Sequence, residues 1–249
     1  MNSSFTRRSA TRLYCDAPLS PGAEVTLPEA AAHHAVSVLR LQVGDALNLF
    51  NGEGGEYRAI LVAANKRETR ARLLEFDATE RESPVDITLA LGISAGERMD
   101  YSLQKATELG VTAIQPLATE RSVVKLADER ADKRVQHWQH VVIAACEQCG
   151  RNRVPSVAPV RKLFAYLADV DRGKRLLVLS PDAGTPLKQV APAAAAVLLI
   201  GAEGGLAPAE YQAAQASGFE PVRLGPRILR TETAPVAALA VLQALWGDL

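Results

Sequence analysis

The stretch LGPRILRTETAP (224–235) places charged and polar side chains directly before a segment that is almost wholly apolar. The run that leads into it, EPVRLG (220–225), is short and apolar, which predicts a buried strand. The run that follows, PVAALAVLQALW (235–246), predicts a helix with proline in its first turn. Thr231 or Thr233 is expected to cap this helix, and free backbone amides at its start could hold an anion or another polar group.

Upstream of this stretch, short apolar strands alternate with amphipathic helices as far back as residue 86. The predicted strands are DITLALGIS (86–94), VTAIQPLAT (111–119), RLLVLSP (175–181), AVLLIGA (196–202) and EPVRLG (220–225). The predicted helices cover residues 98–109, 131–150, 163–170, 208–218 and 235–246. Continuous apolar strands are typical of buried parallel sheets, so this alternation predicts an α/β domain with a mostly parallel sheet.

The first eighty residues have a different pattern of apolar runs and turn residues. They contain a predicted helix at 27–41, a hairpin at 43–64 whose turn NGEGG supplies the glycines that tight turns need, and a strand at 69–77. Short strands separated by turn residues indicate a small β-barrel. The polar segment ATERESPV (78–85) then marks a linker. The chain is therefore expected to hold a barrel domain at 1–77, a linker at 78–85 and an α/β domain at 86–249.

Composition limits the class of protein. The 249 residues include 28 Lys and Arg against 28 Asp and Glu, and this zero formal charge argues against binding of polyanions by the whole surface. Three cysteines favour a reducing compartment over a disulfide framework. The start MNSSFTRRSATRLY lacks the apolar segment of a signal peptide, and the longest apolar run is too short to span a bilayer. We therefore expect a soluble cytoplasmic protein.

Three strand ends carry most of the candidate chemistry. They are LSPDAGTP (179–186), IGAEGGLAP (200–208) and LGPRILRTETAP (224–235). Ligands of open α/β sheets bind beyond the carboxyl ends of the strands, so the three segments are expected to form one site. Glu203 adds a carboxylate among glycines that let a backbone approach a ligand. Taken singly, these glycines could be ordinary turns and the threonines ordinary caps. GAEGG matches neither the dinucleotide fingerprint GxGxxG nor a P-loop.

No metal site is expected. Cys146 and Cys149 form a single CxxC on a helix, without the second pair that zinc sites require. His137 and His140 lie one turn apart on the same helix, but no acidic third ligand is evident.

Basic residues recur in local groups even though the protein is neutral. Arginine suits phosphate because its planar fork donates two parallel hydrogen bonds. Each group alone could be a solvated face, and their recurrence modestly favours RNA as a ligand. The candidate RNA-binding residues are Arg7, Arg8, Arg12, His34, Arg40 and Arg151.

The two glycine-rich and arginine-rich loops also carry a family resemblance. LLIGAEGGLAPAE followed by LGPRILRTETAPVAAL resembles the IGPEGG…LG.RILRTETA signature of the ribosomal RNA small subunit methyltransferase E family, the 16S rRNA (uracil-1498-N3)-methyltransferases. AHHAVSVLRLQVGD (32–45), QKATELGVTAIQP (104–116) and EQCGRNRVP (147–155) agree with the same family in the same order. Ala202 departs from it, because the family often has proline there.

The resemblance implies a fold and partners. It implies a SPOUT-class domain with a C-terminal trefoil knot, a PUA-like N-terminal domain that helps to bind RNA, and a homodimer. It implies S-adenosylmethionine as methyl donor, with the loop 224–235 wrapping the cofactor and the apolar helix after it packing in the knot and the dimer interface. The cofactor-binding residues implied by it are Leu179, Ser180, Ile200, Gly201, Glu203, Gly204, Gly205, Leu224, Gly225, Ile228, Leu229, Arg230, Thr231, Thr233 and Ala234.

The reaction implied is methylation of N3 of uridine 1498 in 16S rRNA of the small subunit. Uracil N3 carries a proton, so the enzyme needs a base or a positive charge that stabilises the uridine anion. Arg230 is the candidate for the charge and Glu203 for the base, although Arg230 could only bind phosphate and Glu203 could only cap the helix at Pro208. Two alternatives remain: a SPOUT enzyme with another target, such as a ribose 2′-oxygen of rRNA or tRNA, and a non-catalytic RNA-binding assembly factor.

Overall fold

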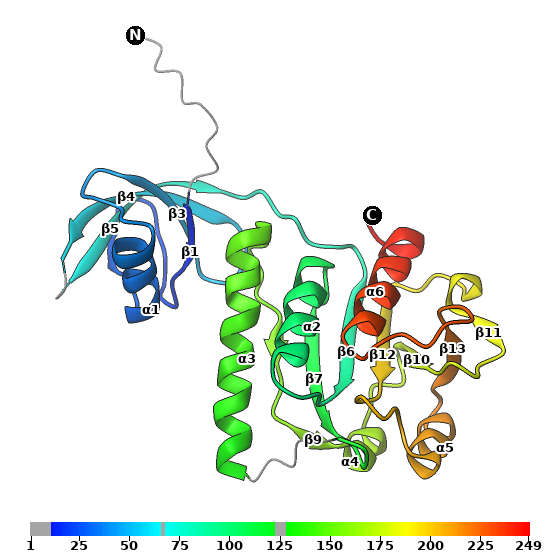
Figure 1. The fold of residues 1–249 in the computed structure, drawn as a ribbon. Coiled ribbons are helices and arrows are strands. Elements are labelled where there is room, and N and C mark those ends of the chain that lie inside the picture. The colour runs from blue at the N-terminus through cyan, green and yellow to red at the C-terminus, as the bar shows by residue number, and fades with distance from the viewer. Residues whose placement is uncertain (1–10, 66–67, 123–127) are drawn as a thin grey trace. The chain divides into compact units, whose positions relative to one another are not determined.

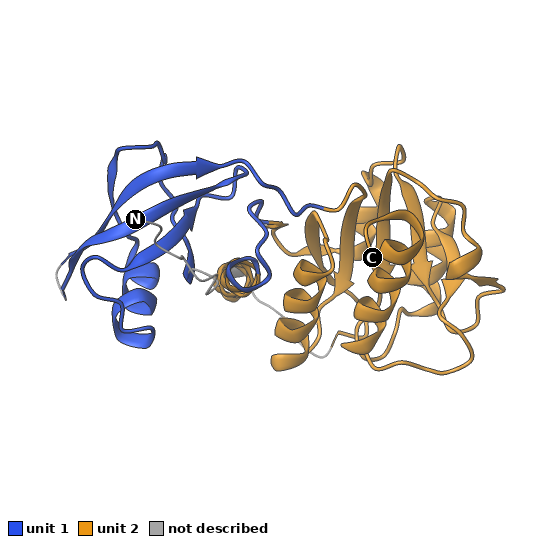
Figure 2. Cartoon of the chain, turned by 90° about the horizontal axis from the view of Figure 1, so that it is seen from above, with its two compact units in different colours: residues 1–82, 146–154 blue, residues 83–145, 155–249 orange. Residues whose placement is uncertain are grey.

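The chain folds into two compact units. The computed structural model describes residues 11–65, 68–122 and 128–249. Unit 1 comprises Met1–Glu82 together with Cys146–Val154, and unit 2 comprises Ser83–Ala145 together with Pro155–Leu249 (Figure 2). The division after Glu82 falls inside the segment expected to be a linker. The sequence did not reveal that Cys146–Val154, far along the chain, belongs to the N-terminal unit.

Unit 1 is built on a five-stranded sheet with the order β1-β3-β4-β5-β2 (Figure 1). Its strands are β1 (Thr11–Tyr14), β2 (Glu24–Thr26), β3 (Ala46–Phe50), β4 (Glu56–Ala64) and β5 (Thr69–Asp77). The predicted hairpin is the antiparallel pair β3–β4, and β5 extends it as predicted. The end strands β1 and β2 were not predicted, because each is only three or four residues long. β1 pairs in parallel with β3 and β2 antiparallel with β5.

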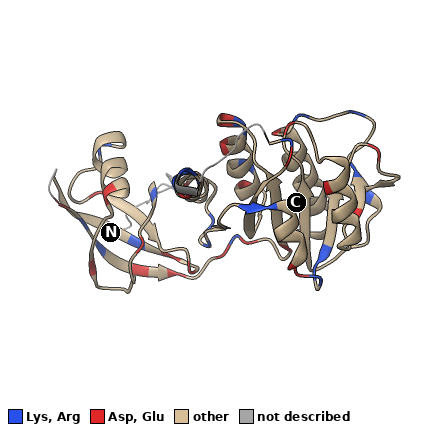
Figure 3. Cartoon of the chain, turned by 90° about the horizontal axis from the view of Figure 1, so that it is seen from below, with Lys and Arg blue, Asp and Glu red and all other residues tan. Residues whose placement is uncertain are grey.

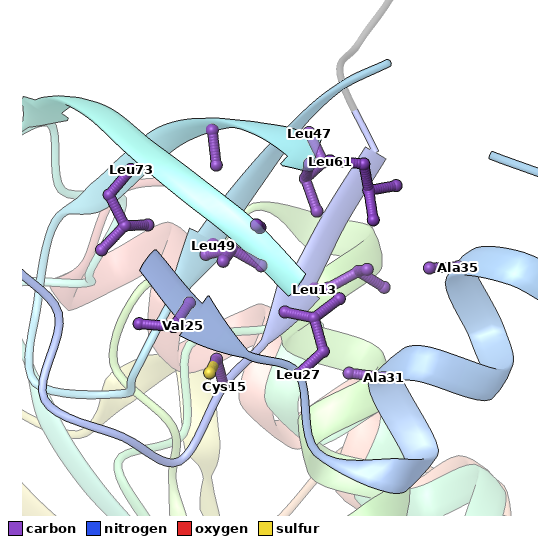
Figure 4. Packing of buried hydrophobic residues seen from close by; sticks show 12 residues of the cluster. Leu13, Cys15, Val25, Leu27, Ala31, Ala35, Leu47, Leu49, Leu61 and Leu73 are labelled. Carbon is purple, nitrogen blue, oxygen red and sulfur yellow. The ribbon is translucent and has the colours of Figure 1, made fainter. Parts of the chain in front are cut away.

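The helix predicted at 27–41 is shorter than expected. It consists of α1 (Glu29–His33) and a π-helical turn η1 (His34–Val38). Arg40 ends it with a φ of 57°, a left-handed conformation that non-glycine residues rarely adopt. Figure 4 shows how Ala31 and Ala35 from this segment face buried leucines, including Leu13 of β1 and Leu27, which directly follows β2. This cluster is the hydrophobic core of unit 1.

Two arginines fasten the segment Cys146–Val154 to the sheet of unit 1. Arg12 donates from Nη2 to the carbonyl oxygen of Arg151 at 3.0 Å and to Oδ1 of Asn152 at 2.7 Å. Its guanidinium also forms an ion pair with Glu56. Arg151 is only 4 % exposed, and its Nε donates to Oε2 of Glu82 at 3.0 Å. Burial lowers the pKa of Arg12, with the charge of Arg81 acting in the same direction. These contacts explain why the segment joins unit 1.

Unit 2 contains the predicted parallel sheet. Its strand order is β11-β13-β10-β12-β6-β7-β8, with β9 pairing on β7, and each of these pairs is parallel. The strands are β6 (Asp86–Gly92), β7 (Ala113–Ala118), β8 (Ser156–Val157), β9 (Arg161–Lys162), β10 (Arg175–Leu179), β11 (Thr185–Pro186), β12 (Ala195–Ile200) and β13 (Glu220–Arg223). The five predicted strands are confirmed. The two-residue strands β8, β9 and β11 were missed because they carry no periodic signal.

All five predicted helices of unit 2 are present. They are α2 (Glu97–Glu108), α3 (Asp128–Cys149), α4 (Leu163–Ala168), α5 (Pro208–Ala216) and α6 (Thr233–Trp246), with a short 3-10 turn η2 (Leu187–Gln189). Tyr166 of α4 and Ala214 of α5 pack with Val197 and Leu199 of β12. α6 contacts α2, and Figure 1 shows both in front of the sheet. No described helix is both long enough and apolar enough to cross a membrane.

A buried glutamine holds α6 in place. Gln243 is 1 % exposed, and its Nε2 donates to the carbonyl oxygen of Leu109, just after α2, at 2.9 Å. Its Oε1 accepts from Ser83 Oγ at 2.7 Å. The nitrogen and the oxygen of the side-chain amide therefore each have a hydrogen-bond partner, as burial of a polar group requires. Acidic and basic residues are interspersed along the chain of each unit, as Figure 3 shows.

Candidate active site

The three segments that carry the candidate chemistry, 179–186, 200–208 and 224–235, meet at one cavity of unit 2. β13, β10 and β12 are adjacent in the sheet and parallel, so the loops that follow them leave the same edge. Together they form a cavity of about 660 Å³. It is lined by Arg121, Leu179, Ser180, Pro181, Asp182, Ile200, Gly201, Ala202, Glu203, Gly204, Gly205, Leu206, Pro208, Tyr211, Leu224, Gly225, Arg227, Ile228, Leu229, Thr231 and Ala234. Its volume suits a nucleoside-sized ligand.

The loop after β12 is a tight turn that only glycine permits. Gly205 has a φ of 68° and its N–H donates to the carbonyl oxygen of Ala202 at 2.8 Å. A Cβ on Gly201 would lie 2.6 Å from the carbonyl carbon of Gly205, a backbone atom that cannot move aside. The glycines therefore fix a compact backbone wall on one side of the cavity, as the sequence suggested.

The other walls of the cavity are mostly apolar. Leu179 and Ile200 contribute from the strand ends, and Leu224, Ile228 and Leu229 from the loop after β13. Ile228 is 84 % exposed, which is unusual for a large apolar side chain. Apolar side chains with a few polar groups are the typical lining of a site for a flat ring such as a purine.

Glu203 does not cap α5. Its Oε1 accepts from the backbone N–H of Ala95, just before α2, at 2.9 Å. Its Oε2 is buried and makes no hydrogen bond with any residue the structure describes. At the start of α5 it is Glu210 that bonds to the backbone, because its Oε2 accepts a hydrogen bond from the N–H of Ala207 at 2.9 Å. The alternative that Glu203 is only a helix cap is therefore wrong.

Arg98 lies between two carboxylates near the cavity. Its Nη1 is 3.7 Å from Oε1 of Glu203, and its Nε is 4.0 Å from Oε2 of Glu232. Both carboxylates are mostly buried, at 18 % and 22 % side-chain exposure. Arg98 thus links the loop after β12 to the loop before α6.

The start of α6 differs from the prediction. Neither threonine caps it: the residue before the helix is Glu232, and no side chain bonds to the first amides. The carbonyl oxygen of Arg230 accepts from the N–H groups of Thr233 and Ala234, each at 2.9 Å. These two amides are therefore not free to hold an anion. Thr231 lines the cavity, and its Oγ1 is buried and unpaired within the described chain.

The cavity gathers most of the residues expected to bind a cofactor. All of them line it except Arg230 and Thr233, whose side chains are exposed. Two lining residues lie outside the three segments that the sequence pointed to: Arg121 after β7 and Tyr211 of α5. A polar residue at the end of one more parallel strand was the signal that could have found Arg121.

The expected RNA-binding residues are scattered. Arg7 and Arg8 lie outside the described residues. Arg12 and Arg151 make contacts within unit 1, to Arg151, Asn152 and Glu82, and their binding of RNA stays a prediction. His34 lies with Nδ1 3.8 Å from Oε2 of Glu147. Arg40 is exposed, and among the six it is the clearest cation on the described surface.

The histidines and cysteines form no cluster with metal-ligand chemistry. Across the described residues, no three His, Cys, Asp or Glu side chains lie together. His137 pairs with Asp100, with Nε2 and Oδ2 2.8 Å apart on an exposed surface. Cys146 is buried and donates weakly to the carbonyl oxygen of Arg153.

Family models match both units. A model described as an RNA methyltransferase domain matches residues 81–243, and one described as an RNA methyltransferase PUA domain matches residues 27–74. Ribosomal RNA small subunit methyltransferase E of Synechocystis is 39 % identical, over 90 % of this chain and 74 % of its own length. The enzyme of the same name from Buchnera aphidicola (Schizaphis graminum) is 33 % identical, over 98 % of this chain and 99 % of its own.

Solved structures agree with this match. Ribosomal RNA small subunit methyltransferase E from Neisseria gonorrhoeae, bound to S-adenosylmethionine, superposes with a TM-score of 0.90 at 44 % identity, covering 96 % of this chain and 99 % of that one. A Legionella pneumophila protein, also solved with S-adenosylmethionine, gives 0.92 at 39 % identity with the same coverage. Sequence and structure therefore lead to one conclusion: the chain belongs to the ribosomal RNA small subunit methyltransferase E family.

Proposed function

We propose that this protein transfers a methyl group from S-adenosylmethionine to N3 of uridine 1498 in the 16S rRNA of the small ribosomal subunit. The single observation that carries the proposal is the cavity at the ends of β10, β12 and β13, built from the segments that resemble the family signature. Similarity to enzymes of this name, over nearly the full length of both chains for the Buchnera enzyme, supports the choice of RNA target.

The cavity fits the cofactor. Its apolar side, with Leu224, Ile228 and Leu229, suits the adenine ring, and the glycine turn at Gly201–Gly205 lets backbone come close to the ribose and the methionine chain. Thr231 Oγ1, buried with no partner in the described structure, is available to bond a polar group in the cavity. S-adenosylmethionine supplies an electrophilic methyl group when it is bound.

The protein must then handle the proton on uracil N3. Glu203 is the proposed base, because Oε2 is buried, adjoins the cavity and makes no hydrogen bond to the described chain. Arg230 is the proposed cation that stabilises the uridine anion, and its exposed side chain lies in the loop that borders the cavity. Alignment of the two reactants supplies much of the remaining rate.

The wider setting of the reaction is proposed with it. We infer that the segment after β13 completes a trefoil knot and that the protein acts as a homodimer through the apolar helix α6, whose Leu245 is 46 % exposed. Unit 1, which matches a PUA domain, would contact RNA through Arg40 and its neighbours. We further propose that the reaction takes place in the cytoplasm and that no metal takes part in it.

The test is methyl transfer from labelled S-adenosylmethionine to small subunits that lack the modification. Nuclease digestion and mass spectrometry then identify the modified nucleoside. Appearance of 3-methyluridine at position 1498 is expected, and it should be reduced in Arg230→Ala at unchanged affinity for the cofactor. A ribose methyl in the product would instead establish the alternative SPOUT activity. Cofactor binding without transfer to any subunit would refute the proposed target.

A further inference from the structure

Arg121 lies in a rigid turn at the end of β7. Thr119 and Ser122 close this turn: the N–H of Ser122 donates to the carbonyl oxygen of Thr119 at 3.1 Å, and their hydroxyls are 2.9 Å apart. Both are only 8 % exposed. Glu210 braces the turn further, because its Oε1 accepts from the N–H of Glu120 at 2.8 Å. The backbone that carries Arg121 is thus fixed on both sides.

The Arg121 side chain runs across the glycine turn. Its Nη1 donates to the carbonyl oxygen of Gly204 at 2.8 Å. A Cβ on Gly204 would lie 3.0 Å from the Cβ of Arg121 and 3.2 Å from its Cδ, so the absence of a side chain there lets the arginine pack flat. A guanidinium has five N–H donors and this bond uses one of them. The rest of the guanidinium, with its other N–H donors, borders the cavity.

Among the charged residues that line the cavity, Arg121 is the best suited to bind an anion. They come from Arg121, Asp182, Glu203 and Arg227. The carboxylate of Glu203 is already engaged by Arg98 and Ala95. Arg121 makes no ion pair with any described residue, and unlike Arg227, which lies in an exposed stretch, it is anchored by a hydrogen bond. An anchored guanidinium loses little side-chain entropy when it binds an anion.

We propose that Arg121 forms the subsite for the carboxylate of the methionine moiety of S-adenosylmethionine. This inference rests on the proposed function, because it assumes that the cavity holds that cofactor. A carboxylate is matched by the planar fork of a guanidinium, which can donate two parallel hydrogen bonds to it. The bond to Gly204 would couple the same arginine to the turn that contacts the rest of the cofactor. Arg121 would therefore set the preference of the site for ligands that carry the carboxylate.

The test compares two ligands that differ only in this group. Calorimetric titration of the full chain with S-adenosylmethionine and with its decarboxylated form measures how strongly the site prefers the carboxylate. Loss of a charge-assisted hydrogen bond corresponds to roughly a tenfold loss of affinity or more. Arg121→Gln should lower the affinity for S-adenosylmethionine by about that factor and leave the affinity for the decarboxylated ligand almost unchanged. The preference for the carboxylate then disappears. Arg121→Lys, which keeps the charge, should restore part of it.

Arg172→Gln, at an exposed position outside the cavity lining, is the matched control, and it should keep the preference of the wild type. Arg227→Gln removes the other arginine of the lining and should keep that preference too. Equal weakening of both ligands in Arg121→Gln would overturn the inference, since it would show that the arginine only supports the glycine turn. Transfer of the preference to Arg227 would overturn it as well, as would a wild-type protein that binds neither ligand. A protein that binds with the expected preference but does not modify small subunits would leave this subsite standing and refute the proposed RNA target instead.

Discussion

Glu203 Oε1 accepts a hydrogen bond from the backbone N–H of Ala95, 2.9 Å away, whereas Oε2 of the same carboxylate is buried and unpaired within the described residues. The bond fixes the side chain, and the second oxygen is left to accept a proton. A buried acceptor without a partner is costly, so such atoms are often found at functional sites. This relationship distinguishes Glu203 from Glu210, both of whose oxygens accept backbone N–H groups.

We predict that Glu203→Gln slows methyl transfer far more than it weakens cofactor binding. The amide keeps the shape of the side chain and can still accept from Ala95, but it cannot remove the N3 proton of uridine. General base catalysis contributes about 10²-fold to 10⁴-fold, so a loss of that order in kcat is expected. Single-turnover methylation of small subunits and calorimetric titration with S-adenosylmethionine measure the two effects separately.

Glu97→Gln serves as the control for this prediction, because Glu97 is an exposed acid next to Arg98 and does not line the cavity. It should leave both measurements near the wild-type values. A Glu203→Gln enzyme with a normal kcat would show that another group, or solvent, takes the proton.

The second prediction concerns the backbone wall of the cavity. Gly201→Ala forces a methyl group to within 2.6 Å of a backbone carbon of Gly205, so the turn must open. We expect affinity for S-adenosylmethionine to fall by roughly tenfold or more, equivalent to about 1.4 kcal/mol. Gly184→Ala, also in a loop of unit 2, is the matched control because its Cβ would meet nothing within 4 Å. Equal affinities in the two variants would contradict the role assigned to the turn.

The sequence predicted most of the sheet and most of the cavity. Apolar strands such as Ala195–Ile200 and Glu220–Arg223 have a signal of their own, and parallel strands bring their carboxyl ends to one edge. That rule placed Gly201 and Leu224 at one site before the structure did. Strand order, however, is not a local property, so the sequence did not show that the turn after β7, which carries Arg121, reaches the same cavity.

Charged residues were the least predictable. In the sequence, Arg12 and Arg151 cannot be told from arginines on a solvated basic surface. In the structure they are buried against Glu56 and Glu82. Only the return of Cys146–Val154 to unit 1 makes them structural, and a contact between residues more than a hundred positions apart leaves no trace in a single sequence. The cap expected from Thr231 or Thr233 failed for a local reason, because the N–H groups of Thr233 and Ala234 bond to the carbonyl oxygen of Arg230 instead.

The third prediction tests this structural role. Arg151→Met leaves Glu82 without its cation in a largely buried setting, and the free energy of unfolding should fall by about 3 kcal/mol. Adding Glu82→Leu should recover part of the loss, since the uncompensated charge is then removed. Denaturant unfolding followed by tryptophan fluorescence and circular dichroism measures both. As a control, Arg58→Met breaks an exposed pair with Glu75 and should cost less than about 1 kcal/mol. If Arg151→Met costs no more than this control, the fastening of Cys146–Val154 does not depend on the buried pair.

The fourth prediction uses the cysteines as reporters of the same segment. Burial raises the pKa of Cys15 to about 11 and that of Cys146 to about 12, while Cys149, one turn later on α3, is partly exposed. At pH 8 a thiol of pKa about 11 is ionised to roughly one part in a thousand, and the thiolate is the reactive species. Iodoacetamide should therefore label native protein at Cys149 first, and Cys15 and Cys146 only after unfolding, as peptide mass spectrometry would show. Because Cys146 begins the segment that Arg151 fastens, Arg151→Met should speed its labelling more than that of Cys15. Labelling of native Cys146 as fast as Cys149 would mean that the segment opens readily even with the ion pair intact.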